Sequence, residues 1–149
     1  MVDPYPYLGI GQARLLLLKP ATFMNDSGRS VRAAMDYFKL DSEDVTVFHD
    51  ELDLLPFKVK VKHGGGTAGH NGLRSTDAHI GNAFRRVRIG IGHPGHKDKV
   101  TPYVLGNYAK SEIEPLSDLL AAIASEAEWL AAGDEVRFMS EVARRMQDE

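Results

Sequence analysis

The chain has 149 residues, of which 43% are hydrophobic, and a formal net charge of −3, so it can bury a core as one domain. It contains no cysteine, which excludes disulfides, thiolate metal sites and a cysteine nucleophile. The apolar run at residues 15–18 is too short to cross a bilayer, and residues 1–6 lack the pattern of a leader, so we expect a soluble cytoplasmic protein.

Strands and helices are predicted to alternate in the first half of the chain. Residues 13–19 form a near-continuous apolar run, which is typical of a buried strand. A helix is predicted from residue 26 or 27 to about residue 40, because apolar residues recur there at helical spacing. Residues 45–48 and 57–63 are predicted as strands, and the short acidic link between them indicates an antiparallel pair.

The second half is predicted to end in helices. A short helix is predicted over residues 73–80, and a strand that alternates basic with apolar residues over residues 85–92. A loop rich in glycine and proline is predicted over residues 93–106. Two terminal helices are predicted over residues 111–132 and 134–147. The order β, α, β, β, α, β, α, α indicates the α/β class. We therefore predict a single three-layer domain over residues 1–149, with a mixed β-sheet flanked by helices.

The sequence HGGGTAGHNGL, residues 63–73, joins a predicted strand to a predicted helix. It contains Gly64, Gly65, Gly66 and Gly69 within six residues, and we call residues 64–69 the glycine loop. Glycine permits positive φ and close approach of the backbone to a ligand, and the first N–H groups of a helix carry partial positive charge. The loop is thus a candidate phosphate or carbonyl cradle, or alternatively a surface loop followed by a helix cap.

Charge is distributed unevenly along the chain. Residues 58–99 contain nine lysines and arginines against two aspartates, a local charge of +7, whereas residues 111–149 contain ten acidic residues against three arginines, a local charge of −7. A basic segment around the glycine loop is what binding of a phosphate-rich ligand requires. The alternative is that these charges lie on solvated strand and helix faces.

Acidic and histidine side chains follow the strand predicted over residues 45–48. Of these, Asp50 does not share a face of an extended strand with His49 or Glu51. Asp50 is a candidate to orient and stabilise a histidine base, as carboxylates do in catalytic triads. His49 is either that base or a packed, hydrogen-bonded residue. The histidine spacing matches no metal motif, so no metal site is predicted.

Two loops carry candidate ligand contacts. Phe23 and Asn25, in KPATFMN, combine an aromatic ring with an amide, and Asn71 follows the glycine loop. Each has an alternative structural role, as a core aromatic or as a turn or cap residue. His93 and His96 flank Pro94 and Gly95, and we favour a tight turn over a metal pair there.

Taken in order, the segments KPATFMNDSG, HDELDL, GGGTAGHNGLRS, FRRVRIGIGHPG and YVLG resemble bacterial-type peptidyl-tRNA hydrolases. The resemblance runs from about Gly11 to the C-terminal helices. It implies an enzyme that cleaves the ester between a peptide and the tRNA 3′ end, and that acts as a monomer without a cofactor. By the same resemblance, Asp50 stabilises and orients a general-base histidine, and Phe23, Asn25 and Asn71 contact the peptidyl-tRNA.

One part of the family pattern has no match in these 149 residues. The family begins with a strand and a T-R-H-N-x-G loop that holds the general-base histidine, so the chain is expected to be N-terminally truncated relative to the family. His49 and His70 are the alternatives for the base. Two other functions stay open, namely a relative that binds the tRNA acceptor end without turnover, and a nucleotide or phosphate binder. The latter ranks last because the loop lacks the Lys-Ser/Thr of a P-loop.

Overall fold

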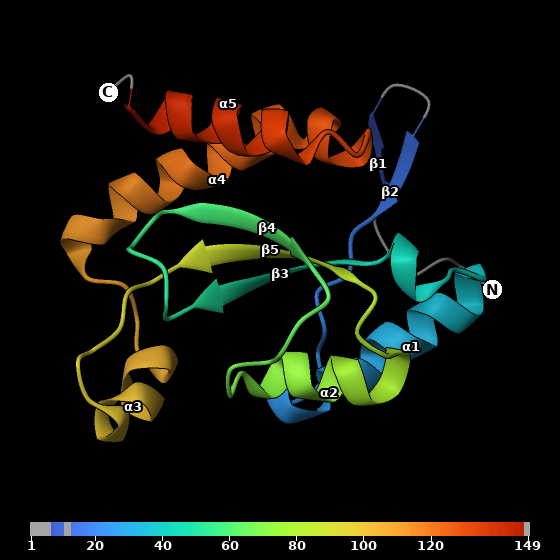
Figure 1. The fold of residues 1–149 in the computed structure, drawn as a ribbon, viewed down its shortest axis with the longest axis horizontal. Helices are drawn as coiled ribbons and strands as arrows, with labels where there is room; N and C mark the ends of the chain where they lie inside the picture. The colour runs from blue at the N-terminus through green and yellow to red at the C-terminus, as the bar shows by residue number, and fades with distance from the viewer. Residues whose placement is uncertain (1–6, 11–12, 148–149) are drawn as a thin grey trace. The chain divides into compact units, whose positions relative to one another are not determined.

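A computed structural model describes residues 7–10 and 13–147 of the chain (Figure 1). The chain groups into two compact units, unit 1 from Met1–Val47 and Lys62–Arg86, and unit 2 from Phe48–Val61 and Val87–Glu149. The single domain over residues 1–149 stays a prediction. The expectation that residues 1–6 carry no leader lies outside the described residues. Within the described ranges, none of the helices is long and apolar enough to traverse a bilayer.

A three-stranded sheet contains β3 (Thr46–Glu51), β4 (Val59–His63) and β5 (Arg85–Gly90), in the order β3-β5-β4 (Figure 1). β3 and β4 are therefore not neighbours, and the predicted antiparallel pair of these two strands is wrong. The short link between them favoured a hairpin, but the later strand β5 lies between them and takes the hydrogen bonds of both.

The backbone hydrogen bonds show that the sheet is mixed. Toward β3 the donors and acceptors ascend together, from Arg85 N–H to Val45 and from Ile91 N–H to Glu51, which is a parallel arrangement. Toward β4 they run in opposite directions, from Gly90 N–H to Lys58 and from Gly64 N–H to Phe84, which is an antiparallel arrangement. The predicted α/β class with a mixed sheet and flanking helices is confirmed.

The apolar run near the N-terminus forms a separate hairpin. β1 (Tyr7–Ile10) pairs antiparallel with β2 (Ala13–Leu16), with Tyr7 opposite Leu16. The prediction of a buried strand over residues 13–19 is thus wrong in two respects. The strand ends at Leu16 rather than at residue 19, and the run is not buried, since Leu17 is 48% exposed. An apolar run indicates strand propensity but not the partner, and a two-stranded ribbon offers no second layer to cover its side chains.

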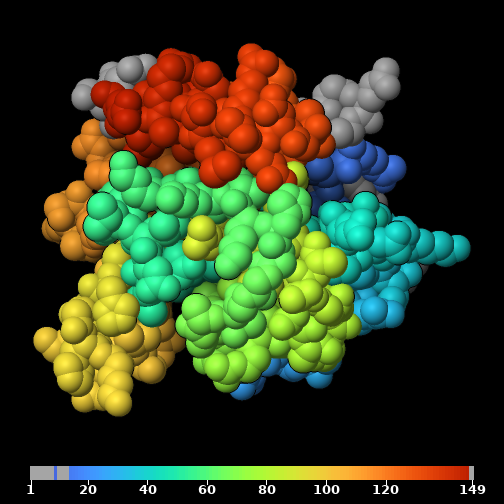
Figure 2. Space-filling model, in the orientation of Figure 1, coloured from blue at the N-terminus to red at the C-terminus, as the bar shows by residue number. Residues whose placement is uncertain are grey.

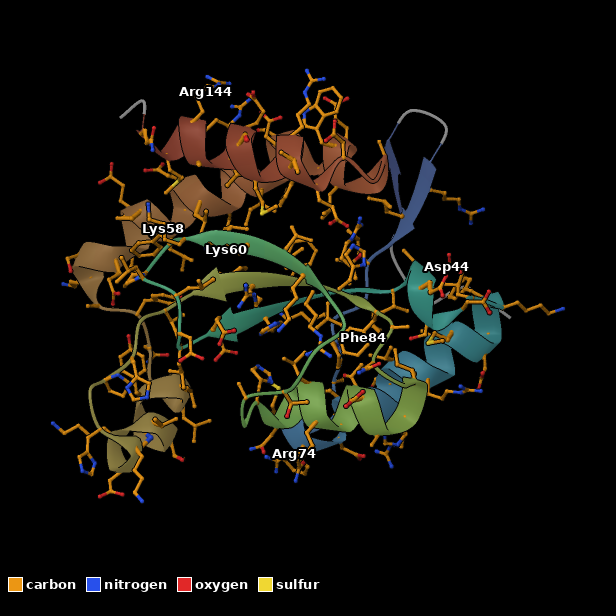
Figure 3. The ribbon with its side chains drawn as sticks, in the orientation of Figure 1. Asp44, Lys58, Lys60, Arg74, Phe84 and Arg144 are labelled. Carbon is orange, nitrogen blue, oxygen red and sulfur yellow. The ribbon has the colours of Figure 1, made fainter. Side chains whose placement is uncertain are left out.

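Two helices form the core of unit 1. α1 (Ser27–Phe38) confirms the first predicted helix and ends where Lys39 takes a left-handed φ of 54°. It packs on α2 (Asn71–Ile80), which begins two residues before the predicted helix. The core of this unit contains Val31, Met35, Leu73, Ile80 and Phe84, the last of which is labelled in Figure 3.

The two terminal helices form the core of unit 2. α4 (Lys110–Ala131) and α5 (Glu135–Gln147) confirm the two helices predicted there, and Gly133 separates them with a φ of 81°. Their buried side chains pack with strand residues of β4 and β5, in a cluster that contains Val87, Leu119, Ile123, Phe138 and Val142. The helical spacing in the sequence therefore located both helices, although Ile113 and Leu120, apolar residues of that spacing in α4, are exposed.

A short helix interrupts the segment predicted as a loop over residues 93–106. α3 (Val100–Leu105) follows a 3-10 turn at Lys97–Lys99. Pro102 argued against a helix in the sequence, but it lies in the first turn, where its missing N–H leaves no helical hydrogen bond unmade. The loop prediction is wrong for these six residues.

Glu126 provides a pH-dependent link between α4 and α5. The carboxylate is buried, and it accepts hydrogen bonds from Arg145 Nε at 2.7 Å and from Trp129 Nε1 at 2.8 Å. The Arg145 bond lowers the pKa of Glu126 below its ordinary 4.5, against the opposing effect of burial. A lowered carboxyl pKa stabilises the fold above the unfolded-state pKa, and this stabilisation is lost as the pH falls through the folded-state pKa.

We therefore expect Glu126→Gln to lower the free energy of unfolding at pH 7 by about 1–3 kcal/mol, because a hydrogen-bonded charge is lost. The difference from the wild type should shrink as the pH falls below about 4.5. Urea unfolding across this pH range measures it. Glu128→Gln, an exposed site on the same helix, is the matched control and should stay close to the wild type throughout. A Glu126→Gln deficit that stays constant down to pH 3 would contradict the prediction.

Candidate functional site

The glycine loop adopts the positive φ angles that its composition permits. Gly64 and Gly65 have φ values of 61° and 96°, in the left-handed region that glycine favours. The N–H of Gly64 donates to the carbonyl of Phe84 at 3.3 Å, so this group fastens the loop to the start of β5. Figure 2 shows the green surface of β4 and of the segment after it on the face turned to the viewer.

A buried arginine lies beneath this loop. Arg86 is 1% exposed, and its guanidinium donates to the carbonyls of Gly66 at 2.5 Å and Gly65 at 3.0 Å. It also lies 4.5 Å from the ring centroid of Phe84. Burial lowers the pKa of Arg86 while the charge of Asp77 opposes that shift, and an arginine stays protonated in either case. Sequence reasoning counted Arg86 only as one of the nine cations of residues 58–99 and missed this role.

The side chain of His70 caps the N-terminus of α2. Its Nδ1 accepts the N–H of Leu73 at 3.1 Å. A neutral imidazole with an accepting Nδ1 carries its proton on Nε2, so that nitrogen is a donor and not a base. His70 would have to give up the helix cap to accept a proton at Nδ1.

The three predicted substrate-contacting residues lie in unit 1. Phe23 is 87% exposed, and Asn25 and Asn71 are exposed as well. Met24, between the first two, lies against the start of α2, because a Cβ on Gly72 would approach its sulfur to 2.7 Å. The structure thus brings the segment of Phe23 and Asn25 beside the segment of Asn71. The alternative of a core phenylalanine at position 23 is wrong.

The predicted catalytic aspartate lies in unit 2. Asp50 is half-buried within β3, which runs to Glu51 and so continues three residues beyond the strand predicted from the sequence. The neighbouring His49 is 8% exposed, and its Nδ1 lies 2.8 Å from the carbonyl oxygen of Asp50. A carbonyl only accepts, so this nitrogen donates. His49 is therefore a buried, hydrogen-bonded residue, which is the second of the two roles considered for it.

Tyr108 is a neighbour of Asp50 that no sequence motif singles out. Burial and then the charges of Asp50 and Glu112 raise the pKa of Tyr108. Its ring stacks on that of Phe57, with centroids 6.4 Å apart. Tyr108 is thus a partly exposed phenol within electrostatic reach of the aspartate. Glu51, in contrast, lies 3.4 Å from Arg88 in an ion pair.

The basic segment is only partly available to a ligand. Lys58, Lys60 and Lys62 are exposed at alternate positions along β4 and just before it, as the alternating sequence predicts, and the first two are labelled in Figure 3. Arg86, however, is buried and Arg88 is paired with Glu51. The local charge of +7 therefore overstates the charge at the surface.

The histidines of GIGHPGH are turn residues. His93 Nδ1 accepts the N–H of Gly95 at 3.0 Å, and His96 Nδ1 accepts the N–H of Asp98 at 3.1 Å. These bonds agree with the tight turn favoured from the sequence. In residues 7–10 and 13–147, no three histidine, aspartate or glutamate side chains gather as metal ligands would.

Comparison with known proteins gives a consistent family assignment. The sequence model of the family described as peptidyl-tRNA hydrolase matches residues 6–149. Curated peptidyl-tRNA hydrolases from Rhizorhabdus wittichii and Sphingopyxis alaskensis are 76% and 72% identical to this chain, each over 93% of it, and it covers 74% and 73% of their lengths. The crystal structure of peptidyl-tRNA hydrolase from Acinetobacter baumannii is 37% identical with a TM-score of 0.83, covering 95% of this chain and 75% of that one.

Proposed function

Because this chain belongs to the peptidyl-tRNA hydrolase family, we propose that Asp50, Phe23, Asn25 and Asn71 carry the chemistry of that family here. The function is hydrolysis of the ester bond between peptide and tRNA, which recycles tRNA during translation. The observation that carries it is the match of nearly the whole chain to hydrolases at 76% and 72% identity. The binding-only alternative has no comparable support.

Asp50 is proposed to orient and stabilise the general base. Hydrolysis of an ester needs an activated water, an oriented base and donors for the developing oxyanion. A carboxylate beside an imidazole fixes its tautomer and stabilises the imidazolium that forms. The half-buried position of Asp50 supports this role, because partial desolvation strengthens the electrostatic interaction.

Neither His49 nor His70 is proposed as the base. The first is only 8% exposed, which leaves little of its imidazole open to a water, and the second caps α2 through its Nδ1. The family motif T-R-H-N-x-G, which holds the general-base histidine, does not occur in these 149 residues. We propose that the base that Asp50 serves is a histidine, as the family resemblance implies.

The substrate contacts are proposed to come from the exposed residues of unit 1. Phe23 offers an aromatic face to a base or an apolar side chain, and Asn25 and Asn71 offer amides that both donate and accept. Lys62, which is exposed in the same unit, adds positive charge that attracts the phosphates of RNA. The substrate is peptidyl-tRNA, held at its 3′ acceptor end. We further propose a monomer that acts in the cytoplasm without a cofactor, on the strength of the family resemblance.

Asn71 gives a direct test of the substrate site. The helix cap is made by His70, so Asn71→Ala should leave α2 folded. The loss of hydrogen bonds to substrate should lower kcat/KM for peptidyl-tRNA by about 10–100-fold. Asn82→Ala, an exposed asparagine beyond the other end of α2, is the control and should keep the wild-type value. Equal rates for the two variants would remove Asn71 from the site.

The function itself is tested by release of peptide from an N-blocked aminoacyl-tRNA. We expect the released peptide to increase with time in proportion to the amount of protein. Salt-sensitive binding of tRNA without any release would instead indicate the binding-only relative. Thermal stabilisation by nucleotides but not by tRNA would indicate the nucleotide binder.

A further inference from the structure

Two consecutive peptide planes of the glycine loop are fixed by one buried cation. The carbonyls of Gly65 and Gly66 both point to the guanidinium of Arg86. The peptide bonds of the described residues are trans, and in a trans peptide the carbonyl of one residue and the N–H of the next point in opposite directions. The N–H groups of Gly66 and Thr67 therefore point away from the buried guanidinium.

The side chain of Lys62 also lies against the loop. A Cβ on Gly65 would lie 2.5 Å from Cε of Lys62, so the stem of that lysine lies across the loop. Gly65 and Gly66 are nevertheless exposed. Backbone N–H groups on adjacent peptides that face the same way form an anion-receptive concavity. The loop is thus fastened by its carbonyls and presents N–H groups.

We propose that Arg86 is a positioning residue for substrate binding, which holds the glycine loop so that the N–H groups of Gly66 and Thr67 face a phosphate oxygen of the tRNA acceptor end. The inference rests on the proposed function, because that function supplies the phosphate. Arg86 does not touch the substrate. It acts through two carbonyls, which the planar fork of guanidinium donors holds in a fixed geometry.

Lysine at position 86 keeps the charge but not the fork. We expect Arg86→Lys to raise the KM for peptidyl-tRNA about tenfold, while kcat stays within about threefold of the wild type. A purely structural role would instead lower the amount of folded protein without this split. Arg32→Lys, at an exposed arginine of α1, is the control and should change neither constant. An unchanged KM in a folded Arg86→Lys protein would overturn the proposal.

The wild-type protein provides a test that does not depend on folding of a variant. We expect a titration with an acceptor-stem RNA minihelix ending in CCA to shift the amide resonances of Gly66 and Thr67 more than that of Gly64, whose N–H is bonded to Phe84. A shift at Asn71 without shifts at Gly66 and Thr67 would overturn the role of Arg86 and leave the proposed substrate site standing. No shift at any of them would overturn both.

Discussion

Asp50→Asn is expected to lower kcat/KM for peptidyl-tRNA by about 10²–10⁴-fold, since a neutral amide neither fixes the tautomer of a histidine base nor stabilises the imidazolium. Asparagine has nearly the shape of aspartate, and the side chain is half-buried at the end of β3. The fold should therefore survive the change. Steady-state release of peptide from N-blocked aminoacyl-tRNA measures the effect.

Asp53→Asn is the matched control for this prediction. Asp53 is an exposed carboxylate of the same HDELDL segment, three residues farther along, so the substitution removes the same charge at a nearby position. We expect its kcat/KM to stay within about twofold of the wild type, because solvent screens an exposed charge. A comparable loss in the two variants would indicate a general field effect and would refute a specific role for Asp50.

The pKa of Tyr108 provides a second test of the Asp50→Asn substitution. The charge of Asp50 contributes to the raised pKa of Tyr108. Removing that charge in Asp50→Asn should therefore move the titration of Tyr108 downward, toward its ordinary value of 10.0. Such a shift would show that the substitution removed a charge that acts on Tyr108.

The patterns that the sequence predicted correctly are those set by local chemistry. Helical spacing located α1, α4 and α5, and alternation located the exposed lysines of β4. The glycine loop took positive φ where its composition allows it. In each case a short stretch of chain determines the outcome, because side-chain periodicity and backbone freedom depend on neighbouring residues.

The predictions that failed depend on partners distant in sequence. Nothing in the residues of β3 and β4 indicates that β5, which begins some twenty residues after β4, lies between them in the sheet. The buried position of Arg86 is also absent from its local pattern, since RRVRIG alternates as any half-exposed strand does. Its carbonyl partners lie 20 and 21 residues away. A local pattern fixes which face a residue takes, and the tertiary structure decides what covers that face.

A large effect on stability is expected at Gly28. The N–H of Gly28 donates to Ser75 Oγ at 2.9 Å where α1 packs on α2. A Cβ at this position would lie 2.1 Å from the carbonyl oxygen of Ser75. The obstacle is backbone, which cannot move aside as a side chain can, so the two helices must separate. We expect Gly28→Ala to lower the free energy of unfolding by about 3 kcal/mol or more, at the upper end of overpacking costs.

Gly9→Ala is the control in the same unit. A Cβ on Gly9 meets no atom of the described residues within 4 Å, and an extended strand accepts alanine at least as well as glycine. We expect its free energy of unfolding to stay within about 0.5 kcal/mol of the wild type. Urea unfolding of both variants compares the two sites directly. Similar stabilities would mean that α1 and α2 do not approach each other closely at Gly28, and the close packing that places Met24 against the start of α2 would then be in doubt as well.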